Sequence, residues 1–127
     1  MDLAVRKKRI LIADDEPSIR RLYWRVLRKE GYEVILAASG EEAVRLAREA
    51  KPDLAVLDID MPGMDGVQAL QRIRSVERSL PVIFNTANSC YEENILCWSP
   101  EAYVVKSSEL AELKDTIRCL LRRRSDP

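Results

Sequence analysis

The chain has 127 residues, 46% of them apolar and 33% charged, and its 21 basic and 21 acidic residues give a formal net charge of zero. This size and composition predict one folded domain with a single core and a well-solvated surface. The charge balance argues against nucleic acid or a membrane surface as partner, since such binders usually carry a basic excess, and no apolar run approaches the roughly 20 residues that span a bilayer.

The first predicted element is a buried strand over residues 9–13, a short apolar run that ends in the acid pair Asp14 and Asp15. Pro17 then opens a helix at a first-turn position, where its missing N–H has no intrahelical partner to lose. Gly31 follows the helical pattern at the position where a left-handed residue is common. We therefore expect a strand, a helix and a glycine cap in this order.

A second strand is predicted over residues 32–37, and the next helix follows it directly. Ser39 and Glu42 have the spacing of a capping box, in which each side chain accepts a hydrogen bond from the other residue's backbone N–H. That helix stops before Pro52. Residues 54–57 are apolar throughout, as expected of a strand that is buried on both faces of a parallel sheet.

This third strand runs into Asp58 and then into a turn marked by Pro62, Gly63 and Gly66. Asp58 would therefore sit at the carboxyl end of a central strand, where open α/β sheets bind their ligands. A third helix follows, with apolar residues at helical spacing from Val67 onward.

The last third of the chain predicts two more strands and two helices. Residues 81–85 form a fourth strand that ends at Thr86, and residues 102–105 form a fifth that ends at Lys106. Between them, residues 91–98 are expected to form a short helix. The final helix carries one apolar stripe, made of Leu110, Leu113, Ile117, Leu120 and Leu121. Five alternations of strand and helix predict the α/β class, with a doubly wound parallel sheet and helices on both of its faces.

The use of histidine and cysteine narrows the possible chemistry. The chain has no histidine, which excludes a histidine metal site and Ser-His catalysis. Its three cysteines, Cys90, Cys97 and Cys119, are spaced neither as a disulfide framework nor as a zinc site. The charged segment Met1–Arg9 lacks a signal-peptide pattern. We therefore expect reduced thiols in a cytoplasmic protein, with Cys119 in the core beside Leu120.

Polar residues stand at four of the five predicted strand ends. Asp14, Asp15, Asp58, Thr86 and Lys106 would all lie at one edge, because parallel strands end on the same side of a sheet. Three carboxylates brought together would repel one another unless a cation lay between them, and hard oxygen ligands suit Mg²⁺. The ammonium and hydroxyl groups suit a phosphoryl group beside the metal, with Asp58 as the nucleophile.

With these residues in order, the chain resembles the receiver domains of two-component response regulators from about Arg9 to Leu121. The matching residues are Asp14-Asp15, Asp58 with the loop Met61-Pro62-Gly63-Met64-Asp65-Gly66, Thr86, Tyr103 and Lys106. The resemblance implies a single-domain, flavodoxin-like fold of five βα units with strand order 2-1-3-4-5. We expect one receiver domain over residues 1–127, with its core over about residues 9–121.

The resemblance also implies a role for each residue at the strand ends. A histidine kinase or a histidine phosphotransfer protein would pass a phosphoryl group to Asp58. Mg²⁺ would be held by Asp14, Asp15 and Asp58 and by the backbone carbonyl of Asp60. Such a protein is a phosphoacceptor and not an enzyme with a separate substrate.

The remaining roles concern the response to the phosphoryl group. Lys106 would pair with its oxygens, and Thr86 would donate a hydrogen bond to it. Tyr103 would then change rotamer and couple the site to the surface around the fourth helix, the fifth strand and the fifth helix. Binding of a downstream protein, control of an output domain on a longer chain and onward relay of the phosphoryl group all remain open.

Three features depart from the family pattern. Ser107 follows Lys106 where the family usually has a cis proline, so we predict a trans bond there, because a cis bond before another residue costs about 2.5–4 kcal/mol. The segment from Thr86 to Lys106 is about two residues shorter than expected, which would alter the fourth helix. Asp60 and Asn88 would flank the path of the attacking water, and we hypothesise that they set the lifetime of the phosphoryl group.

Some of these residues also fit other classes of protein. Asp58 and Asp60 have the Asp-x-Asp spacing of haloacid-dehalogenase-type phosphatases, although that family places the pair on its first strand. A receiver fold that only docks to partners, without phosphorylation, is a second alternative. The basic run Arg122–Arg124 fits a solvated helix end that complements the helix dipole better than a nucleic-acid site.

Overall fold

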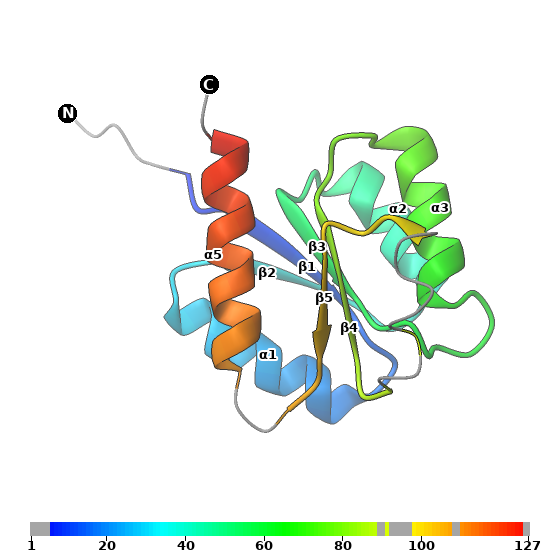
Figure 1. The fold of residues 1–127 in the computed structure, drawn as a ribbon, viewed down its shortest axis with the longest axis horizontal. Coiled ribbons are helices and arrows are strands. Elements are labelled where there is room, and N and C mark those ends of the chain that lie inside the picture. The colour runs from blue at the N-terminus through cyan, green and yellow to red at the C-terminus, as the bar shows by residue number, and fades with distance from the viewer. Residues whose placement is uncertain (1–5, 89–90, 92–97, 108–109, 126–127) are drawn as a thin grey trace.

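The computed structural model describes residues 6–88, 91, 98–107 and 110–125. Five parallel strands form one sheet in the order β2-β1-β3-β4-β5, as predicted (Figure 1). The elements are β1 (Arg9–Ala13), α1 (Pro17–Lys29), β2 (Glu33–Ala37), α2 (Gly40–Glu49), β3 (Leu54–Leu57), α3 (Gly66–Val76), β4 (Val82–Thr86), β5 (Ala102–Val105) and α5 (Ala111–Ser125).

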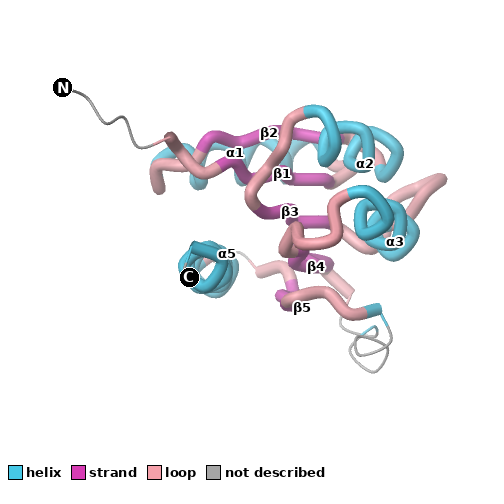
Figure 2. Tube along the Cα trace, turned by 90° about the horizontal axis from the view of Figure 1, so that it is seen from above, coloured by secondary structure: helices cyan, strands magenta, loops and turns pink. Residues whose placement is uncertain are grey.

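The three central strands are buried because helices cover both faces of the sheet. Every residue of β3 and β4, and all of β1 except its first residue, is buried. Successive side chains point to opposite faces, so the apolar runs supply two cores at once. One core joins the sheet to α1 and α5, and the other joins it to α2 and α3 (Figures 1 and 2).

The helix ends follow the local sequence signals, except that one hydrogen bond of the predicted capping box has a different donor. Gly31 has φ +97°, and the N–H of Tyr32 donates to the carbonyl of Leu27 (3.2 Å), so the predicted glycine cap is confirmed. At α2 only half of the predicted capping box forms. The hydroxyl of Ser39 accepts from the N–H of Glu42 (3.1 Å), but the Glu42 carboxylate accepts from Ala38 instead.

A complete capping box lies at the start of α3, where the sequence analysis had not placed one. The Asp65 carboxylate accepts from the N–H of Gln68 (2.9 Å), and the Gln68 side chain accepts from the N–H of Asp65 (3.1 Å). This box fixes where the loop after β3 ends and the helix begins.

The prediction for Cys119 was wrong, because its side chain is exposed. The apolar stripe of α5 is otherwise as predicted, with Leu113, Ile117, Leu120 and Leu121 buried. Consecutive residues of a helix point about 100° apart, so a neighbour of Leu120 in sequence falls outside the stripe.

Further expectations concern the chain after β4 and the helices as a whole. No peptide bond among the described residues is cis, so the Lys106–Ser107 bond is trans as predicted. Cys90, Cys97 and most of the predicted helix 91–98 lie outside the described residues, so the expected change in this fourth helix lies outside them too. Within the described ranges, no helix is both long and apolar enough to cross a membrane.

Candidate functional site

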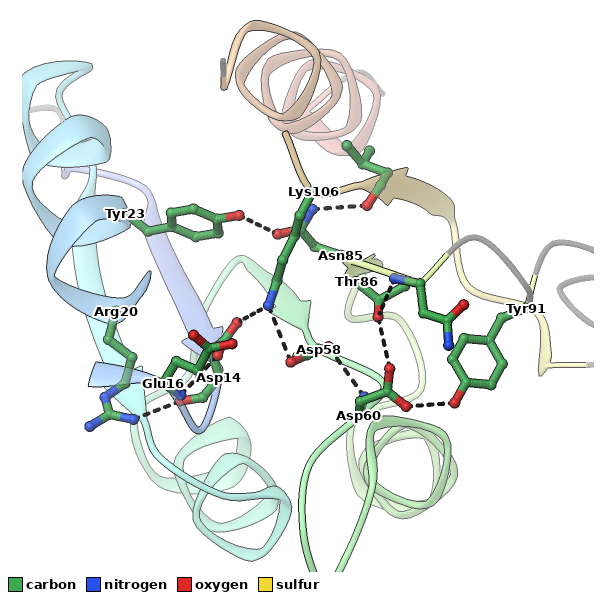
Figure 3. A network of polar contacts seen from close by, with 12 residues as sticks. Asp14, Glu16, Arg20, Tyr23, Asp58, Asp60, Asn85, Thr86, Tyr91 and Lys106 are labelled. Atoms are coloured by element: carbon green, nitrogen blue, oxygen red, sulfur yellow. Dashed lines mark hydrogen bonds and ion pairs between the residues drawn. The ribbon is translucent and has the colours of Figure 1, made fainter. Parts of the chain in front are cut away.

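The predicted site residues converge at the carboxyl edge of the sheet (Figure 3). Asp14 follows β1, Asp58 follows β3, Thr86 ends β4 and Lys106 follows β5. These four strands are neighbours, with Ala13 opposite Leu57 and Thr86 opposite Val105 in the register. Segments as far apart as residues 14 and 106 therefore meet around one point.

Three carboxylates form the acidic centre of this edge. One oxygen from each of Asp14, Asp15 and Asp58 lies within 4.8 Å of the others. Asp14 and Asp58 are 2% and 5% exposed, whereas Asp15 is more accessible to solvent. A compact set of carboxylate oxygens that is open on one side fits a hard divalent cation such as Mg²⁺, which keeps some of its waters.

Lys106 bridges the two buried carboxylates. Its Nζ lies 2.6 Å from Oδ2 of Asp14 and 3.2 Å from Oδ2 of Asp58. Burial lowers the pKa of Lys106, but the hydrogen bond to Asp14 and the charges of Asp58 and Asp14 outweigh it, so the pKa is raised. The ammonium group therefore stays charged inside the site.

The same surroundings disfavour the ionised form of Asp58. Burial raises the pKa of the Asp58 carboxyl group, the nearby Lys106 lowers it and Asp14 raises it, and the net direction is upward. Burial is the largest of these causes, and by formal charge one ammonium faces three carboxylates at this edge. A bound cation would relieve this excess of negative charge.

Asp58 is held by its own backbone and by the loop that follows it. Its N–H donates to the carbonyl of Ala13 (2.9 Å), and its Oδ1 accepts from the N–H of Asp60 (3.2 Å). Gly66 packs against this backbone, because a Cβ there would overlap the carbonyl oxygen of Asp58 and lie 2.8 Å from Cα of Ile59. From the sequence Gly66 is only a turn residue, whereas in the structure it allows this close approach of the backbone.

The predicted switch residues are linked through Asn88. The Thr86 hydroxyl, which is fully buried, donates to Oδ2 of Asp60 (3.3 Å) and accepts from the N–H of Asn88 (3.4 Å). The Tyr103 hydroxyl donates to the backbone carbonyl of Asn88 (2.8 Å). The structure thus brings together Asp60, Thr86, Asn88 and Tyr103 in one set of hydrogen bonds.

The structure adds two tyrosines that the sequence analysis missed. The Tyr91 hydroxyl donates to Oδ1 of Asp60 (2.5 Å). The Tyr23 hydroxyl donates to the Asn85 side chain (2.6 Å), whose amide donates to the carbonyl of Val104 (2.8 Å). This buried chain ties α1 to β4 and β5 beside Lys106, and burial raises the pKa of Tyr23 to about 12. No local signal marks either tyrosine, since both fit ordinary apolar positions.

Fold and site together define a phosphoacceptor domain of two-component signalling. The family described as response regulator receiver domain matches residues 10–118, and the chain therefore belongs to that family. This membership sets aside the haloacid-dehalogenase interpretation of Asp58 and Asp60. It also confirms the predicted class, a phosphoacceptor rather than an enzyme with a separate substrate.

Curated relatives agree over the length of this chain. The transcriptional regulatory protein PrrA of Mycobacterium tuberculosis is 39% identical over 126 residues, which cover 98% of this chain and 54% of PrrA. The probable transcriptional regulator ycf27 of Galdieria sulphuraria is 44% identical over 125 residues, or 97% of this chain and 49% of the relative. The chain spans about half the length of these relatives.

Solved structures show the same fold. The response regulator TrrA of Thermotoga maritima, crystallised in complex with Mg²⁺ and BeF, has a TM-score of 0.85 and 42% identity, over 89% of this chain and 98% of TrrA. TrrA has also been solved in complex with the histidine kinase ThkA, with a TM-score of 0.83 and 42% identity, over 90% of this chain and 98% of that one. A CheY-like receiver domain of Methanospirillum hungatei has a TM-score of 0.87 and 29% identity, over 93% and 96% of the two chains.

Proposed function

We propose that Asp58 is the phosphoacceptor of this receiver domain and that it takes a phosphoryl group from a phosphohistidine in a reaction that requires Mg²⁺. The observation that carries the proposal is the buried pair Asp14 and Asp58 on either side of the Lys106 ammonium, with Asp15 beside them. A structural ion pair would need one carboxylate, whereas this edge gathers three. The excess of charge is suited to binding a cation.

The residues around Asp58 suit in-line phosphoryl transfer. A carboxylate oxygen of Asp58 attacks phosphorus, the P–N bond of the phosphohistidine breaks and its electron pair returns to the imidazole. Lys106, already 3.2 Å from Asp58, lies where it can pair with the oxygens of the transferred group. Bound Mg²⁺, held by Asp14, Asp15, Asp58 and the Asp60 carbonyl, would neutralise negative charge that develops there.

The proposed donor is a sensor histidine kinase or a histidine phosphotransfer protein in the cytoplasm. The structure of TrrA with the histidine kinase ThkA supports this partner, because TrrA is 42% identical to this chain over the aligned residues. The relatives of about twice the length are named as transcriptional regulators, so an output domain or a separate downstream protein would read the switch. We treat residues 1–127 as a single receiver domain with its core over about residues 9–121.

Thr86 and Tyr103 are proposed to transmit the change. On phosphorylation the Thr86 hydroxyl would donate to a phosphoryl oxygen and move toward it. Its bond with the Asn88 N–H would then change, and Asn88 also accepts from Tyr103 (2.8 Å). Tyr103 would change rotamer and alter the surface around the fourth helix, β5 and α5.

The direct test is incubation with acetyl phosphate, with and without Mg²⁺, followed by intact-mass measurement. We expect a gain of one phosphoryl group that requires Mg²⁺ and is lost in Asp58→Ala. Asp115→Ala, at an exposed acid of α5, is the matched control and should be phosphorylated normally. No gain in the wild type under either condition would contradict the proposal and favour docking without phosphorylation.

Asp60 and Asn88 are proposed to set the lifetime of the phosphoryl group. Asp60 is exposed beside Asp58, and Asn88 is exposed beyond Thr86, so both can reach water that approaches the site. Dephosphorylation rates of Asp60→Ala and Asn88→Ala should differ from the wild type. Unchanged rates in both variants would reject this role.

A further inference from the structure

The carboxylate of Asp60 is held by two hydroxyl groups from different segments (Figure 3). The Tyr91 hydroxyl donates to its Oδ1 at 2.5 Å, and the Thr86 hydroxyl donates to its Oδ2 at 3.3 Å. Asp60 itself is exposed, so its side chain would be free to turn into solvent without these bonds. With one oxygen bound by Tyr91, the other oxygen faces Thr86.

The bond between Asp60 and Thr86 competes with the proposed switch. A threonine hydroxyl has one proton to donate, so Thr86 donates either to Asp60 or to a phosphoryl oxygen on Asp58. Any contact that stabilises the Asp60–Thr86 bond therefore favours the resting state, and the phosphoryl group must overcome that preference.

Tyr91 is itself supported from the core. Its ring lies 5.7 Å from the ring of Trp98, and Trp98 meets Phe84 edge to face at 6.0 Å. Phe84 is fully buried in β4, two residues before Thr86. These contacts run from Phe84 through the two rings and Asp60 to Thr86, and both ends lie on β4. They fix the Tyr91 hydroxyl relative to Thr86.

A hollow beside this contact gives Asp60 somewhere to move. It has a volume of about 520 Å³, and Asp60, Tyr91 and Trp98 are among the residues that line it. When Thr86 donates to a phosphoryl group on Asp58, the negative charge of that group repels the Asp60 carboxylate. The carboxylate can then move away from it into the hollow.

We propose that Tyr91 is a positioning residue that holds Asp60 against Thr86 and thereby stabilises the resting state of the receiver. The inference rests on the proposed function, since it assigns a further residue to the same switch. Tyr91 acts through Asp60, so the effect of substituting Tyr91 should vanish when the Asp60 carboxylate is absent.

The test is a double-mutant cycle on the affinity for beryllofluoride, a phosphoryl analogue, measured by calorimetry in saturating Mg²⁺. Loss of one hydrogen bond corresponds to about a three- to tenfold change in affinity, so Tyr91→Phe should bind beryllofluoride about three- to tenfold more tightly than the wild type. In the Asp60→Ala background the same substitution should change nothing. Tyr32→Phe, at the opposite edge of the sheet, is the matched control and should bind like the wild type.

The possible results are distinguishable. Unchanged or weaker binding by Tyr91→Phe would overturn the inference, and so would an equal effect with and without Asp60. If Tyr91→Leu alters affinity while Tyr91→Phe does not, Tyr91 serves only to pack against Trp98 and the inference is wrong. Failure of the wild type to bind beryllofluoride and to gain a phosphoryl group would instead overturn the proposed function, and the inference with it.

Discussion

Both edges of the sheet carry charged residues, but the two edges balance their charges differently. At the amino edge, where the parallel strands begin, the Arg9 side chain donates to the carbonyl of Ala50 (2.7 Å). The backbone N–H of Arg9 donates to Asp53 (2.8 Å). Arg74 pairs with Glu101 at 2.6 Å, and the same Glu101 oxygen accepts from a backbone N–H of β4 (2.7 Å). Asp53 and Glu101 thus each tie a loop to a strand.

At the carboxyl edge, charge is concentrated and left unbalanced. Three carboxylates lie within 4.8 Å of one another, and Lys106 bridges the two that are buried. Burying like charges together costs stability unless a cation compensates them. The amino edge is therefore arranged for folding, whereas the carboxyl edge gives up stability for the ability to bind a cation and a phosphoryl group.

The largest expected effect is that of removing Lys106. Lys106→Ala leaves Asp14 and Asp58 buried without their cation, so the free energy of unfolding should fall by about 3–5 kcal/mol in metal-free buffer. Mg²⁺ should restore more stability to this variant than to the wild type. Urea unfolding with and without Mg²⁺ measures both quantities, and a loss that Mg²⁺ does not reduce would contradict the proposed charge imbalance.

Next in size are two glycine substitutions that compare the edges directly. Gly66→Ala forces a Cβ into the backbone at Asp58 and should cost about 3 kcal/mol, together with slower phosphorylation. Gly31→Ala, at φ +97° where the new Cβ has no atom within 4 Å apart from those of its own residue and chain neighbours, should cost about 1 kcal/mol and leave phosphorylation unchanged. Equal losses of stability with equal phosphorylation would show that Gly66 does not position the acceptor.

A smaller effect, with the opposite sign, is expected for Asp58→Asn. Because the folded-state pKa of Asp58 is raised, its ionised form opposes folding above that pKa, so the amide should stabilise the metal-free protein at neutral pH, by less than Gly66→Ala destabilises it. This gain should shrink as the pH falls through the raised pKa toward the ordinary carboxyl value. Urea unfolding across that range is the measurement, and a gain that is independent of pH would count against this cause.

The smallest effect should come from the amino edge. In Glu101→Gln an amide oxygen still faces Arg74 and the backbone N–H, and the ion pair is partly exposed, so the loss should be about 0.5 kcal/mol. Mg²⁺ should not change this loss, and the phosphorylation rate should match the wild type. A stability loss in Glu101→Gln that depends on Mg²⁺ would contradict the claim that only the carboxyl edge is built to bind a cation.

The sequence by itself determined the order of the elements and the identity of the strand-end residues. Apolar runs and helical periodicity are local properties, and β1, β3, β4 and β5 fall close to the ranges expected from them. The meeting of Asp14, Asp58, Thr86 and Lys106 also followed, because parallel strands place their carboxyl ends at one edge. The strand order came from the resemblance to receiver domains, and the structure confirmed it.

Only the tertiary structure decided the contacts between segments that are distant in the chain. Tyr23 meets Asn85 across 62 positions and Tyr91 meets Asp60 across 31, and no local pattern marks either pair. The upward shift of the Asp58 pKa likewise depends on burial and on the distance to Lys106. Hydrogen-bond geometry and desolvation are set by three-dimensional distances, which a periodicity in sequence does not contain.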